Sequence, residues 1–290
     1  MSLKLITVLY KYYNYPQIDL LVNDDTYEIA KLLKNINFIH TFSYQQKRDK
    51  RWRQEKNIIF NIFRKYDLSI NLTASDRSIL YTLCASKNSI SAIEKNKKKS
   101  WWKKILLTNY YHFDTNKHIF LNNLMPLNIL GINHNLEQDP VLPLDLVIDK
   151  MKKRLSTLNI EDFIIFHPSA QYEYKIYPKY LRDRLLGYLN SLDIPIIITG
   201  ANNIIDLGIS NEIPALKNIY NFIRKTSLEE YLALSQLSSA YIGMDTLNMH
   251  IAATQNKRIF TIFGPTNLKM WSPWCNDLKV AANENKPIQT

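Results

Sequence analysis

The feature that most constrains this fold is a repeated alternation of short apolar runs and segments with helical spacing. The clearest runs are Phe163–His167, Ile194–Thr199, Ala240–Gly243 and Arg258–Phe263. Most of them end at small or polar residues, and a segment with helical spacing follows. Apolar runs of this length that alternate with helices are typical of buried parallel strands. The chain is therefore predicted to have an α/β fold with parallel sheets.

The remaining elements follow the same alternation, less regularly in the first half. Helices are predicted over 3–13, 25–33, 49–65, 75–84, 118–130, 145–158, 178–192, 227–237 and 246–254. Further strands are predicted over 17–22, 37–42, 67–72, 89–93 and 219–222. Residues 94–116, which begin EKNKKKSWWKK, interrupt the pattern and are predicted to form a long mobile loop. A polar, proline-containing stretch over 133–143 predicts a linker, so we expect two domains, 1–140 and 141–290.

The charge of the chain is unevenly distributed. The net charge is +11, and residues 1–150 hold 22 Lys and Arg against 14 Asp and Glu. A basic first half indicates an anionic partner, which leaves nucleic acid, an anionic membrane surface and a phosphorylated glycolipid open. Cys84 and Cys275 lie far apart without metal-ligand spacing, so neither a zinc site nor a disulfide framework is expected, and a reducing cytoplasm fits. No apolar stretch approaches the ~20 residues needed to span a bilayer.

Several predicted strands end in residues suited to binding a ligand. The carboxyl ends of parallel strands meet at one edge of a sheet, where α/β proteins bind their ligands. The turn after Gly243 leads directly into a helix, whose free backbone N–H groups favour an anion. Taken singly, Lys175 fits a solvated loop, Asp245 a helix N-cap and His250 a core histidine. Together they predict a ligand cleft in the second domain.

These motifs resemble the ADP-heptose:lipopolysaccharide heptosyltransferases, glycosyltransferase family 9. The matching stretches, in order, are HPSA (167–170) with KIYP (175–178), IIITGA (196–201), KTSLEEY (225–231), IGMDTLNMHIAA (242–253), and FGPT (263–266) with WSPW (271–274). YPQIDLLV (15–22) and YDLSINLT (66–73) resemble first-domain segments of the family. The resemblance covers essentially the whole chain. It implies a GT-B-like fold of two Rossmann-like domains with parallel sheets facing a cleft, an acceptor-side domain over 1–140 and a nucleotide-sugar-binding domain over 141–290.

The resemblance also implies an activity and a donor site. An intact member transfers heptose from ADP-heptose to the lipopolysaccharide inner core with inversion, and it needs neither a metal nor another cofactor. Lys175 would contact the donor phosphates, the backbone of 246–249 would hold the pyrophosphate, and Asp245 would hydrogen-bond the transferred sugar. The implied donor-binding residues are Lys175, Thr199, Gly200, Asp245, Thr246, Leu247, Asn248, Met249 and His250.

The sequence departs from the family pattern in three places. Leu247 and Asn248 stand where the family has glycine and a small or apolar residue, and Asn202–Asn203 replaces an acidic residue. The family's opening strand and G-D turn, whose Asp is the catalytic base, have no counterpart here, and the C-terminal helix after Trp274 is expected to be cut short. The catalytic residue is therefore unknown. An inactive, truncated relative that retains only donor binding is the alternative.

Lipopolysaccharide core is phosphorylated, so it suits the basic first half as an acceptor. The predicted acceptor-binding residues are Arg51, Arg53, Arg77, Lys98 and Lys99. Trp101 and Trp102 are predicted to touch lipid, which would place the protein in the cytoplasm, peripherally at the inner membrane of a Gram-negative bacterium. A solvated charged loop explains the same residues. Nucleic-acid binding is not expected, because no nucleic-acid motif accompanies the charge.

Overall fold

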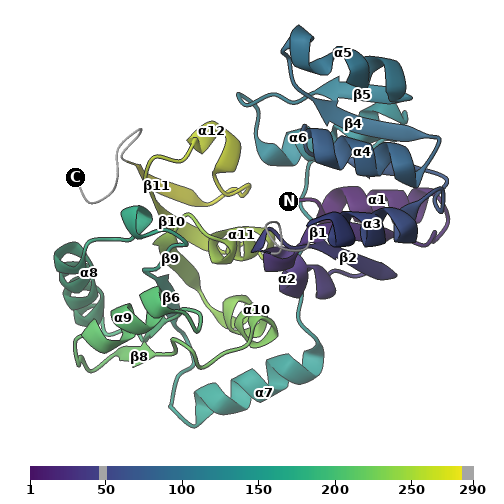
Figure 1. Ribbon diagram of the computed structural model, residues 1–290. Coiled ribbons are helices and arrows are strands. Elements are labelled where there is room, and N and C mark those ends of the chain that lie inside the picture. Colours follow the sequence, from purple (N-terminus) through teal and green to yellow (C-terminus); the bar gives the residue numbers. More distant parts are fainter. Residues whose placement is uncertain (46–50, 283–290) are drawn as a thin grey trace. The chain divides into compact units, whose positions relative to one another are not determined.

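The computed structural model describes residues 1–45 and 51–282, and the chain divides between Glu137 and Gln138 into two compact units, here called unit 1 and unit 2. Both units are built from parallel strands with helices in the connections (Figure 1). All strand pairings in the described ranges are parallel, which agrees with the predicted α/β fold. Within 1–45 and 51–282, no helix is long and apolar enough to cross a bilayer.

Unit 2 contains a six-stranded sheet with the order β11-β10-β9-β6-β7-β8. Its strands are β6 (Ile164–His167), β7 (Ile196–Ile198), β8 (Ile219–Asn221), β9 (Ala240–Met244), β10 (Arg258–Phe263) and β11 (Leu278–Ala282). Its helices are α7 (Asp145–Ser156), the 3-10 turn η3 (Glu173–Lys175), α8 (Lys179–Ser191), α9 (Ile204–Glu212), α10 (Leu228–Leu237), α11 (Leu247–Thr254) and α12 (Leu268–Trp271). The chain builds outward from β6 to β8, then returns to build β9 to β11 on the other side. The strand order therefore reverses between β6 and β9.

The strands at the centre of unit 2 are buried and were predictable, whereas helix α9 and the edge strand β11 are more exposed and gave weaker signals. Phe166 and the β-branched Ile196–Ile198 are fully buried, as expected for strands covered on both faces. Helix α9 was not predicted, because its segment contains Gly208, which disfavours a helix. Its first residue, Ile204, is 91% exposed, so the apolar residues do not mark only the buried side. Strand β11 lies at the sheet edge and is mostly exposed, so its burial pattern is weak.

Gly243 in β9 has no room for a side chain. Its neighbour two residues back, Tyr241, is fully buried, and its ring passes over the Gly243 backbone toward Thr246 at the start of α11. A Cβ atom on Gly243 would lie 2.5 Å from the Tyr241 hydroxyl oxygen and 2.8 Å from the His167 carbonyl oxygen. Glycine at this position therefore allows β9 to pack against β6 and lets Tyr241 run beneath the turn.

Unit 1 contains two sheets instead of one. Its elements are α1 (Leu3–Tyr12), β1 (Asp19–Asn23), η1 (Asp24–Thr26), α2 (Tyr27–Lys31), β2 (Phe38–Phe42), α3 (Arg51–Ile62), β3 (Ser69–Asn71), α4 (Asp76–Ala85), β4 (Ser89–Ile93), α5 (Lys97–Leu106), β5 (Asn109–His112) and α6 (Ile119–Ile129). Strands β1 and β2 form one sheet, and β3, β4 and β5 form the other. Side chains link the two sheets, since the Tyr66 hydroxyl donates to Asp19 Oδ2 at 2.7 Å.

The predicted mobile loop over 94–116 is wrong. The structure places helix α5 and strand β5 there. Asn96 caps α5 by accepting a hydrogen bond from the Lys98 N–H at 3.0 Å. Lys103 turns inward and is fully buried, with Nζ 2.6 Å from Asp76 Oδ1 and 2.7 Å from Glu94 Oε2. A lysine-rich helix had the appearance of a loop because one lysine serves as an internal ion-pair partner.

Replacing Gly243 with alanine is expected to destabilise the protein by about 1–3 kcal/mol, because the added methyl group overpacks the contact with Tyr241 and His167. Urea denaturation measures the free energy of unfolding. Gly187→Ala on exposed α8 is the matched control, because a Cβ there meets nothing within 4 Å. That control is expected to be neutral or stabilising by up to about 1 kcal/mol. Equal stability of Gly243→Ala and the wild type would contradict the packing described.

Candidate functional site

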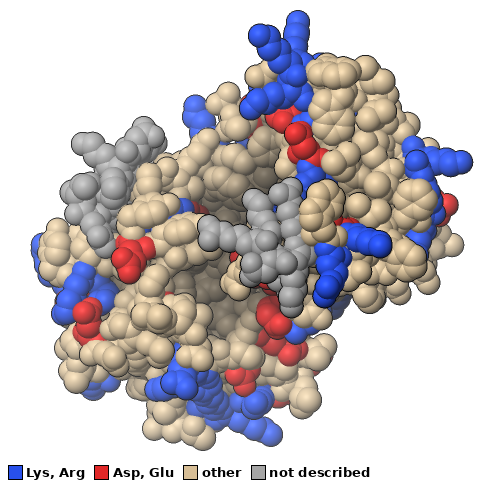
Figure 2. Space-filling model, viewed as in Figure 1, with Lys and Arg blue, Asp and Glu red and all other residues tan. Residues whose placement is uncertain are grey.

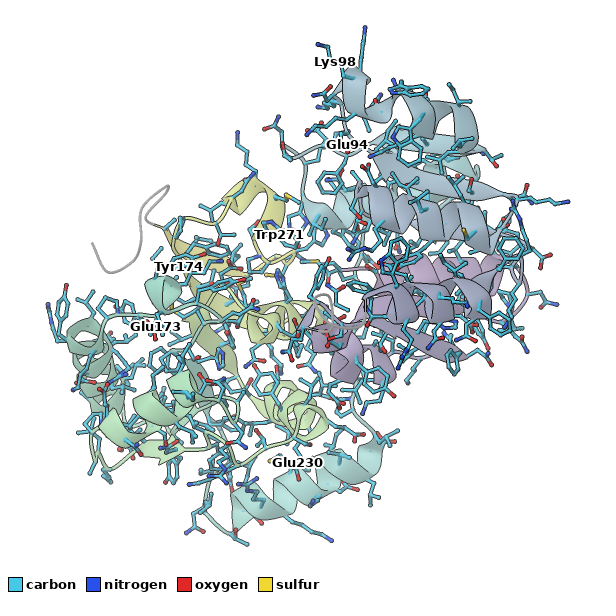
Figure 3. All side chains as sticks on the ribbon, in the orientation of Figure 1. Glu94, Lys98, Glu173, Tyr174, Glu230 and Trp271 are labelled. Carbon is cyan, nitrogen blue, oxygen red and sulfur yellow. The ribbon has the colours of Figure 1, made fainter. Side chains whose placement is uncertain are left out.

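Lys175 joins three strand ends of unit 2. It closes the 3-10 turn η3 in the loop after β6 (Figure 3 labels its neighbours Glu173 and Tyr174). Its Nζ donates to Thr266 Oγ1 at 2.8 Å, in the loop after β10, and lies 3.3 Å from Asp245 Oδ2, directly after β9. The Lys175 and Asp245 side chains are only 19% and 13% exposed. A partly desolvated cation with adjacent acceptors at a carboxyl sheet edge is suited to hold an anionic ligand.

The N-terminus of α11 directly follows Asp245, the carboxylate that lies 3.3 Å from Lys175 Nζ. Thr246 is its N-cap residue, but the Thr246 side chain makes no capping hydrogen bond to the helix. By contrast, Asn203 and Ser227 cap α9 and α10 with their own side chains. The first-turn N–H groups of α11 are therefore not satisfied by their N-cap, and the helix dipole favours an anion there.

His167, the last residue of β6, fixes the geometry between β6, β7 and α11. Its Nδ1 lies 2.9 Å from the Thr199 carbonyl oxygen, and the Asn248 amide nitrogen lies 3.1 Å from Nδ1 and 3.4 Å from Nε2. A neutral imidazole protonated on Nδ1 donates to that carbonyl, which leaves Nε2 as the acceptor for the Asn248 amide. Burial lowers the pKa of His167, and the nearby charge of Asp206 only partly opposes that shift. The Asn248 side chain thus connects α11 to β6. The sequence had marked Asn248 only as a departure from the family pattern, without a structural role.

Asp206 is a buried carboxylate that the sequence did not single out. It accepts hydrogen bonds from the Ser169 hydroxyl, the Ala201 backbone N–H and the Asn203 amide. It belongs to α9, the helix that was not predicted, so no periodic signal marked it. These contacts tie the loop after β6 to the turn after β7, which brings Asp206 within 3.1 Å of a Cβ placed on Gly200.

The structure brings most of the predicted donor-binding residues to one sheet edge. Thr199 and Gly200 follow β7, Asp245 and Thr246 follow β9, and Lys175 lies in the loop after β6. Leu247 is 45% exposed at the start of α11, whereas Met249 is buried and accepts a contact from Thr261 Oγ1. His250 is half-buried one turn into the helix. Met249 can therefore offer a ligand its backbone only.

The predicted acceptor-binding residues lie on three helices of unit 1, namely α3, α4 and α5. Arg53 is exposed on α3, and the Arg51 side chain lies outside the described part of the structure. Arg77 on α4 pairs with Glu55 at 3.1 Å and stacks over Phe42 at 4.3 Å. Lys98 and Lys99 are exposed in the first turn of α5, where Lys98 projects outward in Figure 3. Their acceptor role stays a prediction.

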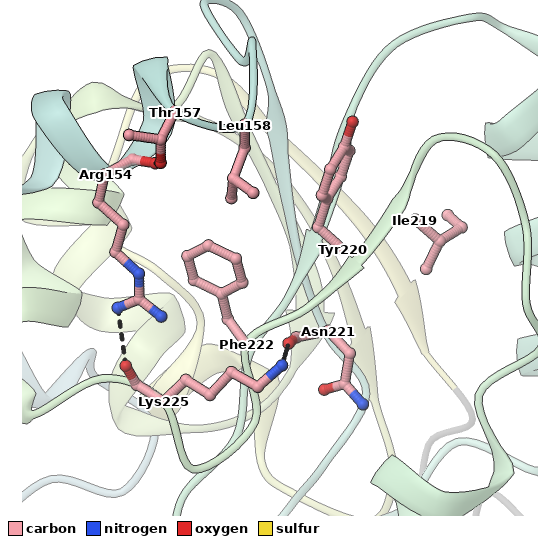
Figure 4. A pocket seen from close by; sticks show the side chains of 8 residues that line it. All are labelled: Arg154, Thr157, Leu158, Ile219, Tyr220, Asn221, Phe222 and Lys225. Carbon is pink, nitrogen blue, oxygen red and sulfur yellow. Dashed lines mark hydrogen bonds between the residues drawn. The ribbon is translucent and has the colours of Figure 1, made fainter.

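A cavity of about 440 Å³ lies elsewhere in unit 2, beside the edge strand β8 (Figure 4). Its lining residues are Arg154, Thr157, Leu158, Ile219, Tyr220, Asn221, Phe222 and Lys225. Arg154 donates to the Lys225 carbonyl oxygen at 2.8 Å, and Lys225 Nζ donates to the Asn221 carbonyl oxygen at 2.7 Å. Both cations thus brace the backbone, and the strand-end residues do not line this cavity. Among the residues that the structure describes, no group of three His, Cys, Asp or Glu side chains is arranged to hold a metal ion.

The lowered pKa of His167 predicts a pH dependence of stability. Unfolded histidine titrates near 6.5, so below that pH the unfolded chain takes up a proton that the folded state resists. The free energy of unfolding is therefore highest above pH 6.5. It falls by up to about 1.4 kcal/mol per pH unit as the pH drops from there toward the pKa of the folded state. Urea denaturation between pH 5 and 8 should show a shallower acid slope for His167→Gln than for the wild type. His112→Gln, on the exposed end of β5, is the control and should keep the wild-type slope.

Comparison with known proteins matches the chain to one family. The family model described as glycosyltransferase family 9 (heptosyltransferase) matches residues 61–290. Lipopolysaccharide heptosyltransferase 3 of Escherichia coli K12 is 26% identical over 278 residues, which cover 91% of this chain and 79% of that protein.

Two solved structures share the fold. A family 9 glycosyl transferase from Veillonella parvula has a TM-score of 0.79 at 16% identity, covering 97% of this chain and 81% of that one. Escherichia coli heptosyltransferase WaaC with ADP has a TM-score of 0.77 at 14% identity, covering 99% and 90%. The predicted GT-B-like fold is confirmed by these neighbours, and the resemblance seen in the motifs is confirmed by the family match. The chain belongs to glycosyltransferase family 9, the heptosyltransferases.

Proposed function

We propose that this chain is an inverting heptosyltransferase that transfers heptose from ADP-heptose to the inner core of lipopolysaccharide. The observation that carries the proposal is Lys175, held between Asp245 and Thr266 at the strand ends beside the uncapped start of α11. The names of the relatives support the substrates, since one is a lipopolysaccharide heptosyltransferase and one structure contains ADP. Unit 2 is then the donor domain, and the basic unit 1 is the acceptor side.

The proposed site acts on the leaving group. When the bond between the anomeric carbon and the diphosphate breaks, negative charge develops on the ADP oxygens. Lys175 and the first-turn N–H groups of α11 would stabilise that charge with fixed positive groups. The Lys175 ammonium donates to Asp245 and Thr266, and the donor phosphates would replace part of these contacts. Asp245 would then be available to the hydroxyls of the transferred sugar.

The acceptor hydroxyl would attack the anomeric carbon from the face opposite the diphosphate, which inverts the configuration. Its proton must pass to a base, and we assign that role to no residue. The acceptor is a phosphorylated glycolipid, so the exposed cations of unit 1 suit it. The lipid part of the acceptor also places the proposed reaction at a membrane surface.

ADP and ADP-heptose are expected to stabilise the folded chain by binding at Lys175. At a concentration of 100 times Kd, the gain is about 2.7 kcal/mol, visible as a rise in Tm. Lys175→Ala should weaken ADP binding roughly tenfold to a hundredfold, because a charge-assisted hydrogen bond is lost. Lys179→Ala, an exposed lysine four residues on that pairs with Asp183, is the matched control and should bind ADP normally.

Transfer to a heptose-deficient lipopolysaccharide acceptor tests the activity itself. Heptose incorporation that Lys175→Ala reduces and Lys179→Ala does not is the expected result. Donor stabilisation without any transfer would favour the inactive relative instead. No stabilisation by millimolar ADP or ADP-heptose in a folded protein would overturn the donor assignment.

A further inference from the structure

Helix α3 presents large apolar side chains to solvent. Trp52 is 87% exposed, Phe60 80%, and Phe63, directly after the helix, 57%. Trp52 and Phe60 are eight residues apart and Phe60 and Phe63 three apart, so all three lie on one side of the helix. The opposite side is the one that packs, because Ile58 and Ile62 are buried against Phe42, Tyr81 and Ala85. The exposed aromatics are therefore additional to those that hold α3 on unit 1.

Helices α4 and α5 extend this exposed layer. The α3 core cluster includes Tyr81 and Ala85 of α4, while Ile79 and Leu83 of α4 pack with Trp102 of α5. Helix α4 therefore packs with both α3 and α5. On the outside of α5, Trp101 is 61% exposed and Ile105, four residues on, is 71% exposed.

The same three helices are strongly basic. Their sequences contain nine Lys and Arg but only two carboxylates, Glu55 and Asp76. Glu55 pairs with Arg77 and accepts from the Tyr81 hydroxyl, and Asp76 pairs with the buried Lys103. Arg53, Lys56 and Lys97–Lys99 remain exposed among the aromatics. Lys and Arg side chains visibly gather around α5 at the top of Figure 2.

We propose that the outer surface of α3, α4 and α5 docks on an anionic phospholipid bilayer. Exposed tryptophan, phenylalanine and isoleucine interleaved with lysine and arginine is the composition of a surface that lies in the membrane interface. The apolar side chains enter the headgroup region, while the cations contact anionic headgroups. The proposal rests on the proposed function in one respect: a lipid-anchored acceptor is presented at such a surface. The proposal changes the prediction that Trp101 and Trp102 both touch lipid. Trp102 is partly buried against α4, and the exposed aromatic side chains of α3 take its place at the surface.

Vesicle co-sedimentation of the full chain tests the proposal. The wild type is expected to bind vesicles of phosphatidylethanolamine and phosphatidylglycerol, to bind phosphatidylcholine vesicles far less, and to dissociate as salt is raised. The triple variant Trp52→Ser, Phe60→Ser, Trp101→Ser should lower the partition coefficient at least about tenfold. The control Tyr180→Ser, Tyr188→Ser, Leu192→Ser removes exposed apolar groups of unit 2 (67%, 63% and 43% exposed) and should bind as the wild type does.

Three outcomes would overturn the proposal: no binding of the wild type to anionic vesicles, equal loss in the control variant, or unchanged binding of the triple variant. A concentration-dependent dimer that the triple variant abolishes, without vesicle binding, would assign the surface to a second copy instead. Stabilisation by ADP is measured on the same proteins. It should be unchanged in the triple variant, so a failure of the donor assignment is seen separately from a failure of the membrane surface.

Discussion

The pairing of β6 with β7 on one side and β9 on the other is the constraint on which the rest of unit 2 depends. The strand order reverses there, and open parallel α/β sheets bind their ligands beyond the carboxyl ends of the strands at such a point. The pairing requires glycine at 243, since the His167 carbonyl oxygen and the Tyr241 ring leave no room for a side chain. It also places Lys175, Asp245 and the start of α11 at the same edge.

A buried polar network then holds that edge in shape. His167 contacts both Thr199 and Asn248, and Asp206 ties the loops after β6 and β7 together. Such a network is stable only when its members are satisfied, and a neutral His167 meets that condition. Lys175 at this edge is partly exposed, and its ammonium donates to both the Thr266 hydroxyl and the Asp245 carboxylate. A ligand phosphate is a stronger hydrogen-bond acceptor for Lys175 than the Thr266 hydroxyl.

The unit 2 strands were predictable, because buried β-branched runs and strand-to-helix turns have local signals, whereas the predicted donor roles came from the family resemblance. Thr199, Asp245 and Thr246 lie where those signals predicted. Asp206 and the Asn248–His167 contact were not predictable, since they depend on partners 37 and 81 residues away. Helix α5 was misread as a loop because the burial of Lys103 between Asp76 and Glu94 is a tertiary effect. The exposed face of α3 was equally invisible, since apolar residues at helical spacing normally indicate a buried side.

A crystal structure of the chain with ADP tests the central claim most directly. The account predicts diphosphate oxygens within hydrogen-bonding distance of Lys175 Nζ and of the first N–H groups of α11, with the Lys175–Asp245 contact lengthened from 3.3 Å. ADP bound away from these groups, for example in the cavity between Arg154 and Tyr220, would contradict it.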